Sequence, residues 1–136
     1  MGTFEIKISV RGLTTGEFIE TEALVDTGAT HTLLPVSFLK ELGVKPIDRI
    51  PFQLDDQHVV NYEVGQVRLR LDGRERIILA VFGEPNAPPL IGATTLELFN
   101  LAVDPVSKRL LPVVGLMKWC YDKEIMNSQF LILNSN

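Results

Sequence analysis

A carboxylate stands at the end of an apolar run in the stretch ALVDTGATHTLLP, at positions 23–35. Asp26 directly follows Leu24 and Val25, and apolar residues resume at position 33. An aspartate in such a place either caps a turn through a side-chain oxygen or acts as a general acid or base. Which of these roles Asp26 has decides the function that the sequence predicts.

Other residues that could carry chemistry are few. The chain has one cysteine, Cys120, and two histidines, His31 and His58. These residues show no metal-ligand spacing, so we expect no metal and no other cofactor. No nucleophile–base spacing joins either histidine to a partner, so both are interpreted as solvated loop residues. Cys120 is interpreted as a packed or partly exposed thiol.

The composition predicts one soluble globular domain covering residues 1–136, with 46% hydrophobic and 22% charged residues. The net charge of −4 includes no basic stripe, so nucleic acid is not an expected partner. The first ten residues alternate apolar and polar types, unlike a signal peptide, and no segment has the apolar length to cross a membrane. Together with the single cysteine, these features predict a cytoplasmic protein.

Strand-like alternation dominates the segments that must position Asp26. Apolar residues alternate along 4–10, and a returning arm at 18–25 leads into the aspartate. The further expected strands are 50–54, 58–64, two arms within 66–82 around an Asp-Gly turn at 72–73, 90–91, and 108–117. The central arms 50–54 and 58–64 would form a hairpin around a polar turn.

Two short helices are expected between these strands. Pro35 opens the first, at 35–42, and Gly43 ends it. The second follows Gly92, with Thr94 or Thr95 as its cap. Its apolar residues Leu96, Leu98 and Phe99 are assigned to the core.

The residues Asp26, Thr27 and Gly28 resemble the active-site signature of aspartic proteases. The order of elements adds to this likeness, because a strand pair precedes the motif, a hairpin lies mid-chain and an apolar-apolar-Gly strand later opens a helix. Over about residues 3–113 the chain thus resembles the retroviral-protease-like (retropepsin-like) family. The resemblance implies an all-β fold, a closed barrel with one or two short helices.

The same resemblance implies roles for individual residues. Asp26 would be the catalytic residue of each chain. Thr27, Gly28 and Ala29 would form the supporting active-site loop, and Leu90, Ile91 and Gly92 the strand that packs against it. Asp55, Asp56, Gln57, His58 and Val59 would belong to the flap, the hairpin tip that covers a bound peptide. Two family positions differ, since Thr30 stands where an acidic residue is common and Ala93 where an arginine is common.

Peptide hydrolysis by this route needs two carboxylates that share one proton across a bound water. Two like charges about 3 Å apart cannot both be ionised, which is the known behaviour of aspartic proteases. The chain contains one Asp-Thr-Gly motif, so a second Asp26 must come from a second copy. We therefore expect a homodimer with its active site on the twofold axis, acting on a peptide or protein substrate.

The sequence thus predicts an aspartic endopeptidase, and three alternatives stay open. The first is a binding module of the same fold that holds peptide or protein without cutting it. In the second, Asp26 is only a turn or cap residue, and in the third the domain is purely structural. Residues 114–136 form a C-terminal extension, whose apolar run at 129–134 is either a core strand or part of the subunit interface.

Overall fold

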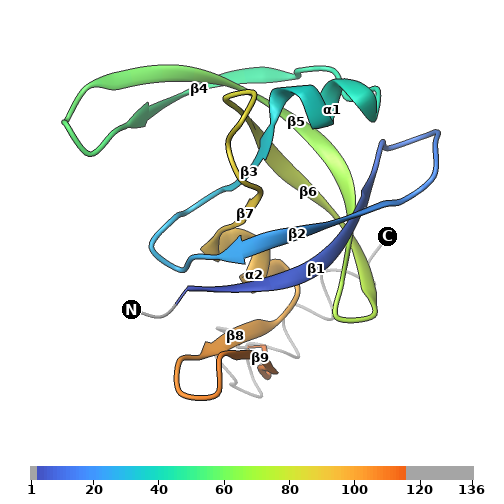
Figure 1. Cartoon of the computed structure of the whole chain (residues 1–136), viewed down its shortest axis with the longest axis vertical. Helices are drawn as coiled ribbons and strands as arrows, with labels where there is room; N and C mark the ends of the chain where they lie inside the picture. Colours follow the sequence, from blue (N-terminus) through green and yellow to red (C-terminus); the bar gives the residue numbers. More distant parts are fainter. Residues whose placement is uncertain (1–2, 116–136) are drawn as a thin grey trace, which may run out of the picture.

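The computed structural model describes residues 3–115 (Figure 1). Most of this part of the chain is β-strand, because alternating apolar residues give each strand one buried face. The elements are β1 (Phe4–Arg11), β2 (Ile19–Val25), β3 (Thr32–Pro35), α1 (Val36–Glu41), β4 (Asp48–Gln53), β5 (Val59–Leu71), β6 (Arg74–Gly83), β7 (Leu90–Ile91), α2 (Ala93–Leu98), β8 (Leu101–Asp104) and β9 (Arg109–Pro112).

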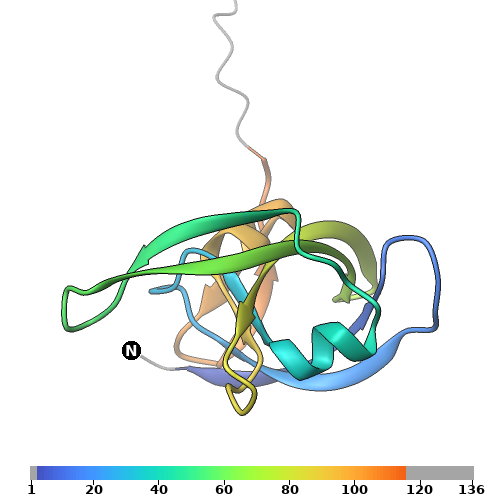
Figure 2. The ribbon, with the colours of Figure 1, turned by 90° about the horizontal axis from the view of Figure 1, so that it is seen from above.

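Six of the strands close into a barrel. Their order is β1-β2-β7-β3-β6-β5, and a further antiparallel pairing between β1 and β5 completes the ring. The pairs β2–β7 and β3–β6 are parallel. Among the described strands β4 pairs only with β5 and lies outside the ring, so the two form a hairpin that extends beyond the barrel (Figures 1 and 2). This is the closed retropepsin-like barrel that the sequence predicts.

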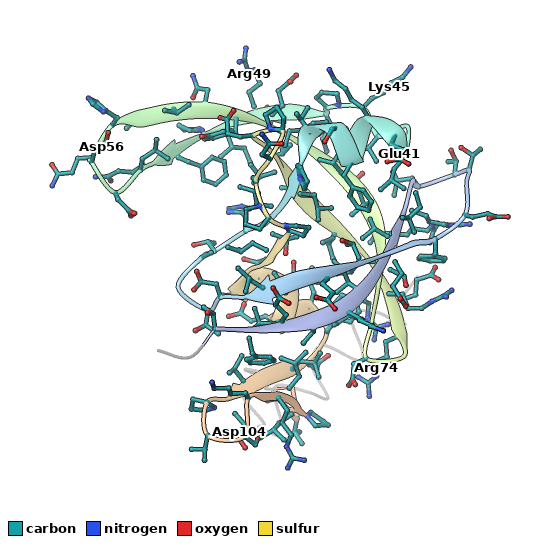
Figure 3. All side chains as sticks on the ribbon, in the orientation of Figure 1. Glu41, Lys45, Arg49, Asp56, Arg74 and Asp104 are labelled. Carbon is teal, nitrogen blue, oxygen red and sulfur yellow. The ribbon has the colours of Figure 1, made fainter. Side chains whose placement is uncertain are left out.

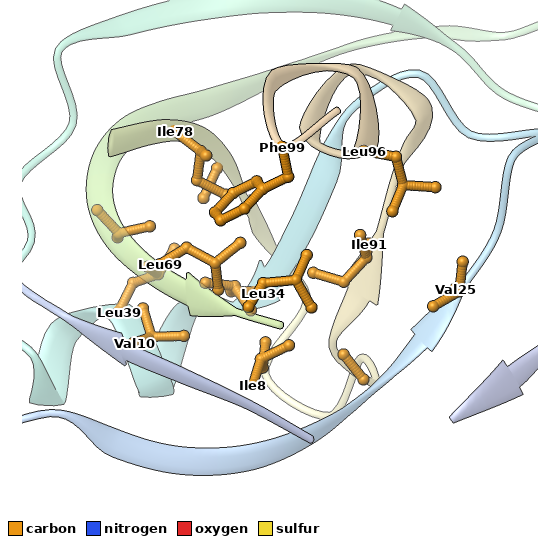
Figure 4. Packing of buried hydrophobic residues seen from close by; sticks show 14 of the residues in the cluster. Ile8, Val10, Val25, Leu34, Leu39, Leu69, Ile78, Ile91, Leu96 and Phe99 are labelled. Atoms are coloured by element: carbon orange, nitrogen blue, oxygen red, sulfur yellow. The ribbon is translucent and has the colours of Figure 1, made fainter. Parts of the chain in front are cut away.

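The inward faces of the strands share one hydrophobic core. Ile8 and Val10 on β1 are buried, whereas their neighbours in the sequence are more exposed, as the twofold period of a strand requires. Figure 4 shows Leu34, Ile91 and Phe99 in this cluster, so β3, β7 and the end of α2 all contribute to it. The core therefore reaches the strands on both sides of the Asp26 loop.

β5 differs from its expected form. The arms predicted at 58–64 and at the start of 66–82 are one continuous strand of 13 residues. Its first half pairs with β4, and from Val64 onward it pairs with β6. Gly65 lies where the partners change, and a Cβ there would come within 3.0 Å of the Lys45 carbonyl oxygen. The glycine interrupts the apolar pattern but does not end the strand.

α1 ends as expected, with Gly43 at φ 75° just beyond it. The prediction for α2 was wrong in two respects. Gly92 is its N-cap, and Thr95 faces inward and is buried. Leu98 is 48% exposed, whereas Leu96 is 3% exposed. Two residues along a helix point to nearly opposite sides, so Leu96 and Leu98 cannot both face the core.

The last described segment forms a small sheet of its own. β8 and β9 pair antiparallel, from Leu101 opposite Pro112 to Asp104 opposite Arg109. β9 ends at Pro112, so the strand predicted for 108–117 is shorter within the described part. The run at 129–134 lies outside the described residues. No helix within residues 3–115 is long and apolar enough to span a membrane.

The two leucines of α2 give a matched test of the core. Leu96→Ala should lower the free energy of unfolding by about 3 kcal/mol, because it opens a cavity. Leu98→Ala should lower it by less than about 1 kcal/mol, because the side chain is half in solvent. Urea unfolding at one fixed protein concentration measures both. Equal losses would contradict the burial described for α2.

Candidate active site

Asp26 follows the last residue of β2 and is held at its backbone and its side chain. Its N–H donates to the carbonyl oxygen of Ile91 at 3.0 Å, and its carbonyl oxygen accepts from the N–H of Ala29 at 3.2 Å. Its carboxylate oxygen Oδ1 accepts from the N–H of Gly28 at 2.9 Å. The carboxylate therefore does cap its own turn. The residue nevertheless stays half-buried, while Thr27 and Gly28 beside it are exposed.

β7 packs directly against the loop that carries Asp26. It pairs parallel with β2 and antiparallel with β3, so it lies between the strands on either side of the loop. Beyond β7, the N–H of Ala93 donates to Ala29 O at 2.7 Å and that of Thr94 to Thr30 O at 3.0 Å. Thr30 and Ala93, the two positions that differ from the family pattern, each take part in one of these backbone bonds.

Gly92 is required by this close approach. A Cβ at position 92 would lie 2.5 Å from the carbonyl oxygen of His31 and 2.9 Å from that of Ala29. The contacted atoms are backbone, so they cannot move aside as a flexible side chain could. Any side chain at Gly92 would separate β7 from the Asp26 loop.

Two buried hydroxyl groups stabilise the contact between β7 and the Asp26 loop. Thr32 and Thr95 are 1% and 2% exposed, and their Oγ1 atoms lie 2.6 Å apart. Thr32 Oγ1 also accepts from the N–H of Gly92 at 3.2 Å. Sequence reasoning missed this pair, because 63 positions separate the two residues. The signal that the sequence did contain is that Thr32 and Thr95 each stand at a position that faces the core.

The hairpin of β4 and β5 carries the predicted flap residues at its tip. The turn is closed by the N–H of Leu54 donating to His58 O at 2.8 Å, and Gln57 has a φ of 69°. His58 Nδ1 lies 2.7 Å from Asp56 Oδ2. Hydrogen bonds from the side chain and the backbone N–H of His58 hold the pKa of Asp56 below its ordinary value. Figure 3 shows Asp56 at the outer end of the hairpin.

A cavity of about 460 Å³ lies between the Asp26 loop and the hairpin. Its lining residues are Asp26, Gly28, Ala29, Thr30, His31, Leu33, Phe52, Gln53, Leu54, Asp55, Tyr62, Val81 and Leu90. The structure thus brings Asp26, two loop residues, Asp55 and Leu90 together around one space. The other predicted flap residues, Asp56 to Val59, are exposed beyond it.

His31 is not the solvated loop residue that we predicted. It is half-buried and lines the cavity, with its ring edge-on to Phe52 at 5.1 Å between centroids and an interplanar angle of 88°. Phe52 in turn contacts Tyr62 at 6.0 Å across the hairpin. His58 is exposed, as expected. The sequence could not show the position of His31, because its environment comes from β4 and β5.

The cavity is lined by two carboxylates, apolar side chains and the neutral polar side chains of Thr30, Gln53 and Tyr62, together with His31. Among residues 3–115, Asp26 and Asp55 are the acidic residues in its lining, and no lysine or arginine belongs to it. No group of side chains suited to a metal ion occurs among residues 3–115. Asp26 is therefore a carboxylate that a backbone hydrogen bond holds at the wall of this cavity.

A family model described as aspartyl protease matches residues 6–95, which include the Asp26 loop, the hairpin and β7. The chain belongs to the aspartyl protease family. A search of curated proteins finds no match to this aspartyl protease sequence.

Solved structures share the fold of this family member. The simian foamy virus (mac) protease has 18% identity and a TM-score of 0.53, and the match covers 71% of this chain and 94% of that one. The EIAV protease, solved with the inhibitor HBY-793, has 14% identity and a TM-score of 0.51, covering 72% and 88%. The chain is thus similar in fold to retroviral proteases along nearly their whole length.

The threonine pair gives an asymmetric prediction for this aspartyl protease fold. Thr32→Val should cost about 2 kcal/mol of unfolding free energy or more, because it leaves both the N–H of Gly92 and the hydroxyl of Thr95 without a hydrogen-bond partner. Thr95→Val should cost about 1 kcal/mol, because Thr32 still accepts from Gly92. Both substitutions keep the side-chain shape. Urea unfolding of the two variants would refute the network if Thr95→Val were the more damaging.

Proposed function

We propose that the protein is an aspartic endopeptidase in which a water molecule is activated between two Asp26 carboxyls of a homodimer. The observation that carries the proposal is the placement of Asp26 on a backbone-fixed loop at the wall of a cavity covered by the β4–β5 hairpin. Membership of the aspartyl protease family supports it. The exposed Thr27 and Gly28 leave this loop accessible to a second copy.

The reaction follows from one proton shared by two carboxyls. The ionised Asp26 of the first copy takes a proton from the water, while the water oxygen attacks the carbonyl carbon of the peptide bond. The protonated Asp26 of the other copy gives its proton to the carbonyl oxygen, which yields a tetrahedral diol. The first Asp26 then gives the proton it took from the water to the peptide nitrogen, while the Asp26 of the other copy takes a proton from a diol hydroxyl. The C–N bond breaks, and a carboxylic acid and an amine leave. The pair returns to its singly protonated form.

The surrounding residues orient and cover the reactants. The N–H of Gly28 holds Oδ1 of Asp26, so the carboxylate keeps one direction while protons move. Asp55 and Leu54, on the inner side of the hairpin tip, line the space where the peptide would lie. Thr27, Ala29 and the β7 residues support the loop. In this proposal the hairpin, including Asp56 to Val59, is the flap that covers an extended peptide.

The alternative function is a peptide-binding module without hydrolysis. The cavity and the hairpin favour peptide binding in either case, so they do not separate the two functions. The unaltered Asp-Thr-Gly loop with its Gly28–Asp26 hydrogen bond favours the enzyme, because a binding module has no need for a fixed carboxylate at that place.

Asp26→Asn separates the two functions. The amide is nearly the same size as the carboxylate and its oxygen can still accept from Gly28, so the fold and the dimer should persist. Hydrolysis should fall by at least about a thousandfold, because no general base remains. Cleavage of an unstructured peptide measures activity, and sedimentation velocity over a concentration series measures dimerisation. Equal activity in both proteins, or full activity of a strictly monomeric chain, would exclude the proposed mechanism.

The rate should trace a bell against pH. Two carboxyls in contact lose their protons in two separated steps, and only the singly protonated pair has both a base and an acid. Activity should therefore rise through the lower step and fall through the upper one, with its maximum on the acidic side of neutral. A cytoplasmic enzyme, as the sequence predicts, would work on the falling side.

The measurement is kcat/KM on an unstructured peptide from about pH 3 to 9, with dimerisation followed at each point. Following the dimer separates titration of the pair from dissociation of the subunits. A steady climb to alkaline pH, or loss of activity with a chelator or a thiol reagent, would point to other chemistry.

A further inference from the structure

His31 carries a feature that the proposed hydrolysis does not use. Its Nδ1 atom is buried and has no hydrogen-bond partner among residues 3–115. The ring packs edge-on against Phe52 and lines the same cavity as Asp26. Burial of a polar atom without a partner is unfavourable, whereas an apolar side chain of similar size would fill the place at no such cost. The buried Nδ1 atom therefore carries a desolvation cost that no hydrogen bond within residues 3–115 offsets.

The rest of the cavity shows what could satisfy this nitrogen. Leu33, Val81 and Leu90 are apolar and would contact the aliphatic part of a bound side chain. Asp26 and Asp55 are acidic, so a carboxylate on the ligand would be repelled. A purely apolar ligand would leave Nδ1 unpaired. A neutral amide avoids both penalties.

An amide also matches the imidazole in either tautomer. A neutral imidazole has one donor nitrogen and one acceptor nitrogen, and an amide offers both an N–H donor and a carbonyl acceptor. Glutamine adds two methylene groups that fit the apolar walls. Nδ1 can meet such a group if the ring turns about its Cβ–Cγ bond, or if Phe52 moves away with the hairpin.

We infer that His31 is a specificity-determining residue, which selects peptides that place a neutral hydrogen-bonding side chain, glutamine above all, in this cavity. The inference rests on the proposed function in that it takes a peptide as the ligand. It adds a substrate class to that function, and it holds for a cutting enzyme and for a binding module alike.

The first test is stability. His31→Leu should leave the melting temperature unchanged or raise it, because the substitution removes an unpaired buried nitrogen from an otherwise apolar contact with Phe52. The measurement is thermal unfolding of the free protein at one protein concentration. A clear fall in melting temperature would show that His31 serves the fold, and it would overturn the inference.

The second test is specificity. The wild-type protein is given an equimolar mixture of unstructured decapeptides. Each position in turn is occupied by Gln, Glu, Met or Leu, and the cleavage of each peptide is followed by mass spectrometry. At one position, the peptide with Gln should have a kcat/KM about tenfold higher than the peptide with Met, whose side chain has nearly the same shape. His31→Leu should bring this ratio to about one or invert it. His31→Asn should keep part of it, and Val106→Ala, a change at an exposed residue between β8 and β9 outside the cavity, should leave the ratio unchanged.

A binding measurement separates this inference from the proposed function. Fluorescence polarisation with the Asp26→Asn variant reports affinity for the same labelled peptides without cleavage. Binding that prefers Gln over Met through His31, with no cleavage by the wild type, would support the inference and refute the enzyme. Cleavage with no Gln preference, or with a preference that survives in His31→Leu, would overturn the inference and leave the enzyme standing. Neither cleavage nor binding of any peptide would overturn both.

Discussion

The contact between β7 and the Asp26 loop is the constraint on which the rest of the site depends. A strand of two residues, Leu90–Ile91, lies between β2 and β3, and Gly92 passes so close to the backbone of 29–31 that no Cβ fits. Ile91 is fully buried in the core and accepts the N–H of Asp26 at its carbonyl oxygen. The position of the carboxylate is therefore fixed by the same packing that stabilises the barrel.

The cavity follows from a second constraint, the length of β5. Because one strand of 13 residues pairs with β6 in the barrel and with β4 outside it, the hairpin is a continuous extension of the barrel wall. It carries Phe52 and Tyr62 to the space beside the Asp26 loop, where Phe52 packs against His31 and Tyr62 packs against Phe52. The strand β5 thus belongs both to the barrel and to the hairpin, and the cavity lies between the hairpin and the Asp26 loop.

The sequence predicted what depends on local pattern. Alternation showed the strands around Asp26, and Gly43 marked the end of α1, because both signals lie within a few residues. Prediction from the sequence failed where the partner of a residue is distant along the chain. The local pattern favours Thr94 or Thr95 as a cap, because the bond from Thr95 to Thr32 spans 63 positions and leaves no local signal. The local pattern also favours a solvated His31, because Phe52 reaches this ring only through the hairpin. β5 was divided in two because the polar and glycine positions at 65–66 resemble a break, although the ladder continues through them.

The central claim is that each active site takes one Asp26 from each of two copies. It is tested most directly by mixing wild-type protein with Asp26→Asn protein at constant total concentration and allowing the subunits to exchange. If both carboxyls are needed, activity follows the square of the wild-type fraction, so an equal mixture retains about a quarter of the activity of the wild type alone. Activity that falls in direct proportion, to about half in the equal mixture, would mean that each chain works by itself and would contradict the account.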